Sequence, residues 1–254
     1  MKKQLLKSAL IAVAGIGLLT GNALATLVNV SESNGEDSLD TIFAGQGWTI
    51  DANADQVTND QLWGFSEPDT GAWATIVVEI AGNANFNNFG IYDGINPNAT
   101  LFTGGDSVKD KVSITYGSGP NLINITNYDW NGVGWVETSD VEVAMSSVFG
   151  FYISGPAGTF KSEVTENSDG LDHMVSYAGT KFPAPGPAGN GLSIGHYVLA
   201  FEDTAGALGQ GSDRDFNDLV IKVESLSPVP EPTTMLLFGT GLVGLAGLAR
   251  RKRS

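Results

Sequence analysis

Acidic side chains gather in two short runs near the end of the chain, and these runs offer the densest set of potential ligands. One β-rich run ends with Phe201-Glu202-Asp203. The next β-rich run is directly preceded by Asp213-Arg214-Asp215-Phe216-Asn217-Asp218. If Tyr197–Phe201 and Leu219–Val223 pair as antiparallel strands, the loop between them brings both runs to one end of the sheet. The candidate ligands are Glu202, Asp203, Asp213, Asp215, Asn217 and Asp218.

Carboxylates that lie this close repel one another unless a cation lies among them or some of them hold protons. Several hard oxygen ligands suit calcium better than a transition metal. The sequence therefore predicts a metal site with Ca²⁺ as its cofactor. Two alternatives stay open: the acids cap strand ends and pair with Arg214, or they catalyse a reaction.

The spacing Asp213-x-Asp215-x-Asn217 repeats that of the first three ligands of an EF-hand loop. Asp218 stands where that loop requires glycine, and a β-rich run follows where the EF-hand has a helix. We therefore expect a calcium site on a β-hairpin and no EF-hand.

A second group of polar residues surrounds Gly170 and consists of Asn167, Asp169 and Asp172. It forms either a second oxygen-rich metal turn or an Asx-rich turn that binds only its own backbone. Asp51-x-Asn53-x-Asp55 has a similar spacing without β-rich flanks, which predicts a solvated loop.

Catalysis has less support than metal binding. The chain has no cysteine and two histidines, His173 and His196, and we expect His173 to be a polar loop residue. Glu202 and Asp203 with Asp215 would supply the paired carboxylates of a glycoside hydrolase, but no aromatic groove adjoins them in the sequence. The expectation is a protein that is not an enzyme, with a carbohydrate-binding or carbohydrate-hydrolysing protein as the rival.

The elements that must position these residues are short strands. β-Rich runs alternate with turns of Gly, Asn, Asp and Pro, and no long amphipathic helix lies between the two ends of the chain. This pattern predicts an all-β single domain over residues 26–227, a β-sandwich or jelly roll. The expected strands are Ala74–Ala81, Phe86–Tyr92, Lys111–Tyr116, Val133–Glu137, Val148–Ser154, Tyr197–Phe201 and Leu219–Glu224.

Three further features bear on the fold and on ligand binding. Residues 26–70 are acidic and weakly patterned, so they form either a subdomain or the first strands. The segment Phe182–Gly191 is expected to be an exposed loop. The five tryptophans (Trp48, Trp63, Trp73, Trp130 and Trp135) are core residues or, where exposed, a platform for sugar rings, with Tyr128-Asp-Trp130 as one candidate.

Both ends of the chain have the composition of targeting signals. Lys2, Lys3 and Lys7 precede the apolar run Leu10–Leu19, and Ala23-Leu24-Ala25 is a small-x-small site, so a signal peptide over 1–25 should end between Ala25 and Thr26. At the other end, Pro230-Glu231-Pro232 precedes 17 uncharged residues and the cluster Arg250–Arg253. As a helix, the uncharged run would span roughly 25 Å, close to the thickness of a bilayer core.

The tail from 228 to 254 resembles the PEP-CTERM sorting signal, in which these three features follow one another in the same order. The resemblance implies that the membrane protease exosortase cleaves the tail. It also implies export to the envelope of a Gram-negative bacterium and association with exopolysaccharide in a biofilm. A plain C-terminal transmembrane anchor is the alternative.

The acidic hairpin is itself similar to a domain of uncharacterised function found in exported bacterial proteins. The likeness rests on Phe201-Glu202-Asp203, on Asp213–Asp218 and on Asn167–His173 upstream, and it covers roughly residues 145–224. It implies a shared site and names no reaction.

Charge limits the partners. Residues 26–229 hold 27 acidic and six basic side chains, a net charge of −21, so nucleic acid and anionic membrane surfaces are not expected to bind. The expected processing partners are signal peptidase and exosortase. The precursor should be tethered to the inner membrane before the protein reaches the cell surface or matrix.

Overall fold

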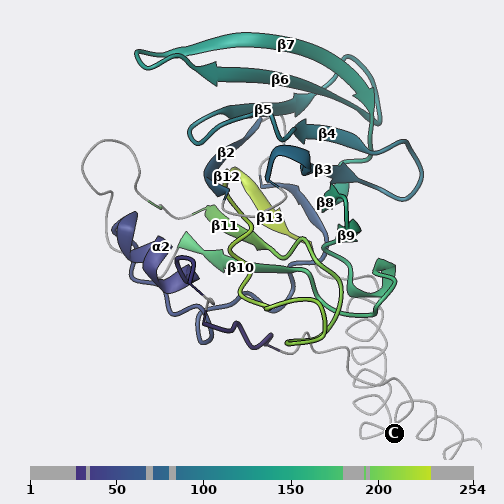
Figure 1. The fold of residues 1–254 in the computed structure, drawn as a ribbon. Coiled ribbons are helices and arrows are strands. Elements are labelled where there is room, and N and C mark those ends of the chain that lie inside the picture. The colour runs from purple at the N-terminus through teal and green to yellow at the C-terminus, as the bar shows by residue number, and fades with distance from the viewer. Residues whose placement is uncertain are drawn as a thin grey trace, which may run out of the picture.

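The computed structural model of the protein describes residues 27–32, 35–66, 71–79, 84–179, 192 and 195–229. These residues form two antiparallel sheets that pack into a β-sandwich (Figure 1). The all-β fold class predicted from the sequence is thus confirmed. Three predicted segments lie outside the described residues: the signal peptide, the loop Phe182–Gly191 and the sorting helix.

The larger sheet has seven strands in the order β10-β11-β12-β2-β5-β6-β7. In that order they span Met174–Ala178, His196–Phe201, Leu219–Glu224, Ala72–Glu79, Lys111–Tyr116, Leu122–Trp130 and Trp135–Ala144. Strands β11 and β12 pair antiparallel, with Phe201 opposite Leu219 at the end that bears the acidic loop. The pairing on which the predicted metal site depends is therefore present.

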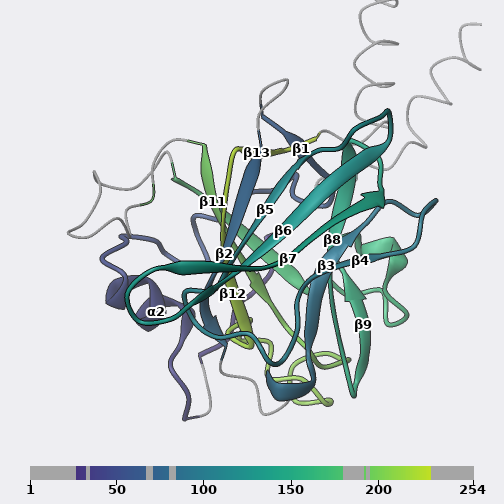
Figure 2. The same cartoon turned by 90° about the horizontal axis from the view of Figure 1, so that it is seen from above.

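The smaller sheet has the order β13-β1-β8-β3-β4, with β9 pairing β8 beside this path. Its strands span Leu226–Pro228, Trp63–Phe65, Val148–Gly155, Asn88–Tyr92, Ala99–Phe102 and, for β9, Gly158–Lys161. Two single-turn 3₁₀ helices, η1 (Ala84–Phe86) and η2 (Val164–Glu166), lie next to β3 and β9 in sequence. Figure 2 shows β8, β3, β4 and β9 gathered on one side of the molecule, with the long β6–β7 hairpin running across it.

The main core fills the space between the sheets. Alternate residues of β2 and β12, such as Ile76, Ile221 and Val223, point into it and meet aromatic side chains of the smaller sheet. Trp63 at the start of β1 and Phe151 in β8 are both fully buried there, with their ring centroids 5.8 Å apart. Two of the five tryptophans, Trp48 and Trp63, are thus core residues.

A second core lies on the opposite face of the larger sheet, where the N-terminal segment covers β10, β11 and β12. Helix α2 (Leu39–Gly45), whose N-cap Ser38 accepts a hydrogen bond from the Thr41 amide, buries Leu39 and Phe43 against this face. Phe43 packs edge-on against Tyr177 of β10. The described part of the segment 26–70 therefore supplies both strand β1 and a cover for the sheet.

The expected strands agree with the structure in most places and differ in two. Lys111–Tyr116 and Leu219–Glu224 have the predicted bounds, and β2, β8 and β11 lie within two residues of theirs where they are described. The run expected at Val133–Glu137 begins only at Trp135, because Asn131 closes a turn by accepting hydrogen bonds from the amides of Val133 and Gly134. The run expected from Phe86 begins at Asn88, since Ala84–Phe86 is a 3₁₀ turn.

Two glycines of the smaller sheet make room for tyrosine rings across the strand pair. Gly90 of β3 lies opposite Tyr152 of β8, and Gly150 of β8 lies opposite Tyr92 of β3. A Cβ atom on Gly90 would lie 2.2 Å from the carbonyl oxygen of Ala99 and 2.6 Å from the Tyr152 ring. Each ring lies over the backbone of its partner strand, so these positions accept no side chain.

Gly90→Ala should therefore lower the free energy of unfolding by about 1–3 kcal/mol, the usual cost of overpacking a filled site. Urea unfolding followed by tryptophan fluorescence measures the change. Gly134→Ala is the matched control, since a Cβ there meets no atom within 4 Å and needs no unusual backbone angle. Equal effects of the two substitutions would contradict this account of the Gly–Tyr pairs.

Candidate metal centre

The acidic loop begins where β11 ends and returns to the sheet where β12 begins. Glu202 follows Phe201 directly, and its amide donates a hydrogen bond to the carbonyl of His173 at 3.1 Å. Asp203 comes next, and its amide donates to Asp218 Oδ2 at 2.8 Å. The two acidic runs, which are separated by nine residues of loop, are therefore linked across the mouth of the hairpin.

The backbone of the second acidic run has an uncommon conformation. Arg214 and Phe216 both have φ of 56°, a region that residues other than glycine rarely occupy. Arg214 is held by its amide, which donates to Ser212 Oγ at 3.0 Å, and Phe216 is held by complete burial in the second core. Such conformations persist where surrounding contacts impose them, and they concentrate at functional sites.

Three carboxylates converge at this loop. One oxygen each of Glu202, Asp213 and Asp215 lies within 4.8 Å of the others, which is a spacing that a single cation can bridge. Glu202 is fully buried, and Thr204 donates a hydrogen bond to its Oε1. Its Oε2 has no hydrogen-bond partner among the described residues. A buried carboxylate oxygen without a donor is costly, and a bound cation would remove that cost.

The other three predicted ligands lie around this group in different roles. Asp203 is buried, and Asn87 donates to its Oδ2 at 2.7 Å. Asn217 is buried and donates to Asp215 Oδ2, while its own Oδ1 has no partner among the described residues. Asp218 points into the same cavity as Glu202. Three of the six predicted ligands, Glu202, Asp213 and Asp215, thus form the convergent group, and the metal site stays a prediction.

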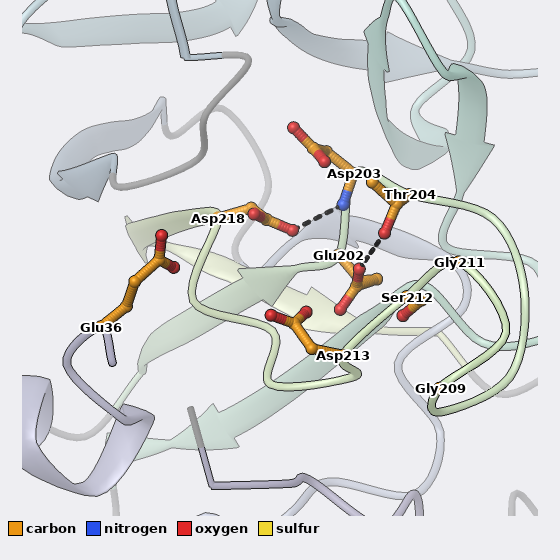
Figure 3. A pocket seen from close by; sticks show the side chains of 9 residues that line it. All are labelled: Glu36, Glu202, Asp203, Thr204, Gly209, Gly211, Ser212, Asp213 and Asp218. Carbon is orange, nitrogen blue, oxygen red and sulfur yellow. Dashed lines mark hydrogen bonds between the residues drawn. The ribbon is translucent and has the colours of Figure 1, made fainter. Parts of the chain in front are cut away.

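A cavity of about 440 Å³ opens in front of the three carboxylates. Figure 3 shows the side chains of Glu202 and Asp213 on one side of this space and those of Glu36 and Asp218 on another. Five carboxylates line it, together with the hydroxyls of Thr204 and Ser212 and the backbone of two glycines. Most of the lining residues therefore carry a carboxylate or a hydroxyl group.

Electrostatics in the cavity favour protonation when no cation is bound. Burial raises the pKa of Glu202, and repulsion from Asp213 and Asp215 raises it further. Burial, and then repulsion from Asp203, raises the pKa of Asp218 to about 8. Arg214, the one basic residue of the acidic runs, donates through Nη1 to the backbone carbonyl of Asp172 at 2.6 Å. The site therefore holds negative charge poorly without a further cation.

The turn around Gly170 supports the hairpin from behind. Asn167 uses both ends of its amide, accepting from the Lys161 amide and donating to the carbonyls of Lys161 and Leu171. Asp169 Oδ2 accepts from the Gly206 amide at 3.0 Å and so ties this turn to the acidic loop. Asp172 Oδ1 accepts from the Met174 amide. The geometry is that of an Asx-rich turn, and these residues do not belong to either convergent carboxylate group of the described chain.

His173 lies in the loop before β10, and its side chain is fully buried. The ring stacks on Phe160 at 4.1 Å, its Nδ1 donates to the carbonyl of Glu202, and its Nε2 lies 3.0 Å from Asp169 Oδ2. Because both ring nitrogens have a polar partner, the cost of removing the imidazole from water is offset. His173 thus fixes the backbone of Glu202.

No pattern in the sequence indicated that the N-terminal segment reaches the site. Glu36 lines the cavity although it is 166 positions from Glu202 in the chain. The amide of Ser31 donates to the carbonyl of Arg214, and Asn217 Nδ2 donates to the carbonyl of Asp37 at 3.0 Å. The segment has no strand pattern of its own, so only its packing in the second core brings it here.

A second acidic group was also missed and consists of Asp106, Asp110 and Asp129. Asp106 accepts from the Thr103 amide, and Asp110 accepts from the amides of Ser107 and Trp130. Asp106 and Asp110 are thus supplied with donors from backbone amides, in contrast to Glu202 Oε2.

The remaining tryptophans lie on the uncovered outer face of the larger sheet around Lys111. Its Nζ lies 4.3 Å from the ring centroid of Trp73, 4.1 Å from that of Trp135 and 5.3 Å from that of Tyr128. Trp130 packs on Trp135 at 4.8 Å. The lysine therefore covers one face of three rings that the sequence offered as a sugar platform.

One serine motif was overlooked in the sequence. Gly191-Leu192-Ser193-Ile194-Gly195 has the spacing of a nucleophile elbow. Ser193 lies outside the described residues, but strand β11 follows at His196 where an elbow requires a helix. His196 itself lies beside Glu224, 3.8 Å away. The surrounding elements are thus not those of an α/β-hydrolase.

Comparison with known families concerns the end of the chain. The family model of the PEP-CTERM protein-sorting motif matches residues 228–253. The chain thus carries a PEP-CTERM protein-sorting motif at its C-terminal end. The motif indicates export, a membrane-anchored precursor and sorting by exosortase. No curated protein and no solved structure matches the chain.

The PEP-CTERM sorting motif starts at the last described strand. Strand β13 ends at Pro228, and the Val229 amide donates to the carbonyl of Leu62 at 2.7 Å, so the tail leaves the domain from the smaller sheet. Residues 230–253 of the motif lie outside the described residues. None of the helices in the described ranges is long and apolar enough to cross a membrane.

Glu202→Gln should stabilise the protein in chelator and reduce the pH dependence of its stability. The raised pKa means that the folded state binds a proton more tightly than the unfolded state, so stability falls as pH rises above the ordinary value of 4.5. The slope is at most about 1.4 kcal/mol per pH unit for each such group. The raised pKa of Asp218 extends the fall to about pH 8.

Urea unfolding in EDTA at several values from pH 5 to pH 8 measures this slope. Glu166→Gln removes a carboxylate that lies half-exposed beside Lys161 and serves as the control. If Glu202→Gln and Glu166→Gln change the slope equally, Glu202 does not carry a buried charge.

Proposed function

We propose that this PEP-CTERM protein is a calcium-stabilised, non-enzymatic protein of the cell surface or extracellular matrix. The observation that carries the proposal is the convergence of Glu202, Asp213 and Asp215 beside a buried oxygen that lacks a donor. The uncommon backbone of the loop supports the same conclusion, because Arg214 and Phe216 occupy positive φ where ordinary turns would use glycine.

Calcium is the cation that fits the donor set. Carboxylate, amide and hydroxyl oxygens surround the site, and neither a cysteine nor a histidine nitrogen contributes to the convergent group. Such hard oxygen donors suit Ca²⁺, which accepts six to eight of them at flexible angles. Mg²⁺ prefers a stricter octahedral arrangement and keeps more of its water. We therefore assign Ca²⁺ to the site as its proposed cofactor.

A structural role fits the position of the site better than catalysis. The acidic loop joins three parts of the chain: the end of the β11–β12 hairpin, the turn of residues 167–173 and the N-terminal segment. A cation there would hold these parts together after export, and the high net negative charge of the mature chain favours such binding. The proposal includes association with exopolysaccharide in a Gram-negative envelope, because the resemblance to the PEP-CTERM sorting signal implies that association. The rival is a carbohydrate-active protein that uses the same acids.

Calcium should raise the melting temperature of the mature domain. At 100-fold excess over the dissociation constant, one site contributes about 2.7 kcal/mol, which corresponds to roughly 5–10 °C for a domain of this size. Differential scanning fluorimetry with and without EDTA measures the shift. Asp215→Ala and the milder Asp213→Asn should both abolish it.

Asp106→Asn is the control, since it alters the other acidic group and should leave the shift intact. An unchanged melting temperature in EDTA would reject the metal site. An enzyme would instead lose turnover on Glu202→Gln while its stability stayed the same or rose, so a hydrolysis assay on neutral polysaccharides tests the rival.

Processing should remove both ends of the chain in the cell. Intact mass spectrometry of the protein recovered from the native envelope should show a start at Thr26 and loss of the apolar tail. A mass that includes Met1 and Ser254 would contradict sorting by exosortase. Deletion of the exosortase is the control and should restore the tail alone.

A further inference from the structure

The cavity in front of the three carboxylates is much larger than one cation requires. Its volume of about 440 Å³ compares with about 30 Å³ for a water molecule in the liquid. Pockets that bind small organic molecules begin at roughly 300 Å³. Once an ion lies against Glu202 and Asp213, most of the space in Figure 3 remains open.

The three convergent carboxylates also leave the ion's coordination incomplete. With one oxygen from each, Glu202, Asp213 and Asp215 supply three of the six to eight ligands that calcium takes. Glu202 and Asp213 line the cavity, so the ion would be open to it. The missing oxygens therefore come from water or from a molecule that enters this space.

The lining determines which molecule is acceptable. Glu36, Asp203 and Asp218 place three further carboxylates around the space, and no basic, aromatic or aliphatic side chain is among its described lining residues. Anionic ligands would be repelled, and apolar ligands would find no surface to pack on. Hydroxyl groups suit this wall, since they donate hydrogen bonds to carboxylates and their oxygens coordinate calcium.

We propose that the calcium-loaded cavity binds a neutral sugar, which coordinates the ion through two adjacent hydroxyl groups. Glu36 lies on the wall across from Glu202 and outside the convergent group, so it accepts a hydrogen bond from the sugar and does not bind the ion. The inference rests on the proposed calcium site and gives that site a ligand. It also makes the N-terminal segment part of the binding wall.

Two measurements on the mature domain separate the ion from the sugar. The first is the calcium-induced shift in melting temperature without any sugar. The second is isothermal titration calorimetry with methyl glycosides of mannose, glucose, galactose and fucose, and with mannan and dextran as neutral polymers, in CaCl₂ or in EDTA. At least one neutral probe should bind in calcium, with affinity at least about tenfold lower in EDTA, a difference of about 1.4 kcal/mol.

Glu36→Gln should keep the calcium-induced shift and weaken the sugar by about fivefold or more, while Asp213→Asn should abolish both. If calcium stabilises the domain and none of the neutral probes binds, the sugar proposal is wrong and the calcium site stands. Binding that persists in EDTA, or preference for polygalacturonate over every neutral probe, would also overturn it. Without a calcium shift, both proposals fail together.

Discussion

Repulsion among buried carboxylates is the constraint on which the rest of this molecule depends. The β-sandwich is complete and apolar between its sheets, yet its sequence places Glu202 and Asp203 at the end of one central strand and Asp218 at the start of its partner. Antiparallel pairing of β11 and β12 makes this meeting unavoidable. Any stable state of the domain must protonate these groups, supply donors to them or bind a cation.

The surrounding structure supplies part of the answer through donors. Asn87 donates to Asp203, the Asp203 amide donates to Asp218, and Thr204 donates to Glu202. Backbone contacts from the turn at residues 167–173 hold Glu202 in place without reaching Oε2. The donors thus reach Asp203, Asp218 and one oxygen of Glu202, while Glu202 Oε2 stays without a donor among the described residues. Polar networks of this kind rigidify a structure when they are complete, and a cation would complete this one.

The predictions from sequence succeeded where local pattern determines structure. The β-branched alternation of Leu219–Glu224 and the contiguous acids beside it identified both the strand and the loop, because both signals lie within a few residues. They failed where distant segments meet, since only tertiary packing brings Glu36 to the cavity. Strand β6 (Leu122–Trp130) was also missed, although it pairs with its sequence neighbours β5 and β7 and apolar residues alternate with polar ones in its first half. The burial of His173 depends on Asp169, which is near it in sequence, and on Phe160, which is not.

The same packing explains why the site lies at this end of the sandwich. Among the described residues, the larger sheet carries a core on both faces where the N-terminal segment, together with Leu192, covers β10, β11 and β12. Phe216, between Asp215 and Asn217, is buried in that second core and draws the acidic run under the cover. Burial of Phe216 therefore removes the neighbouring acidic side chains from water. The cavity is the side on which they still face solvent. Loss of the N-terminal cover would rehydrate the loop, so docking of this segment and occupation of the site should be thermodynamically linked.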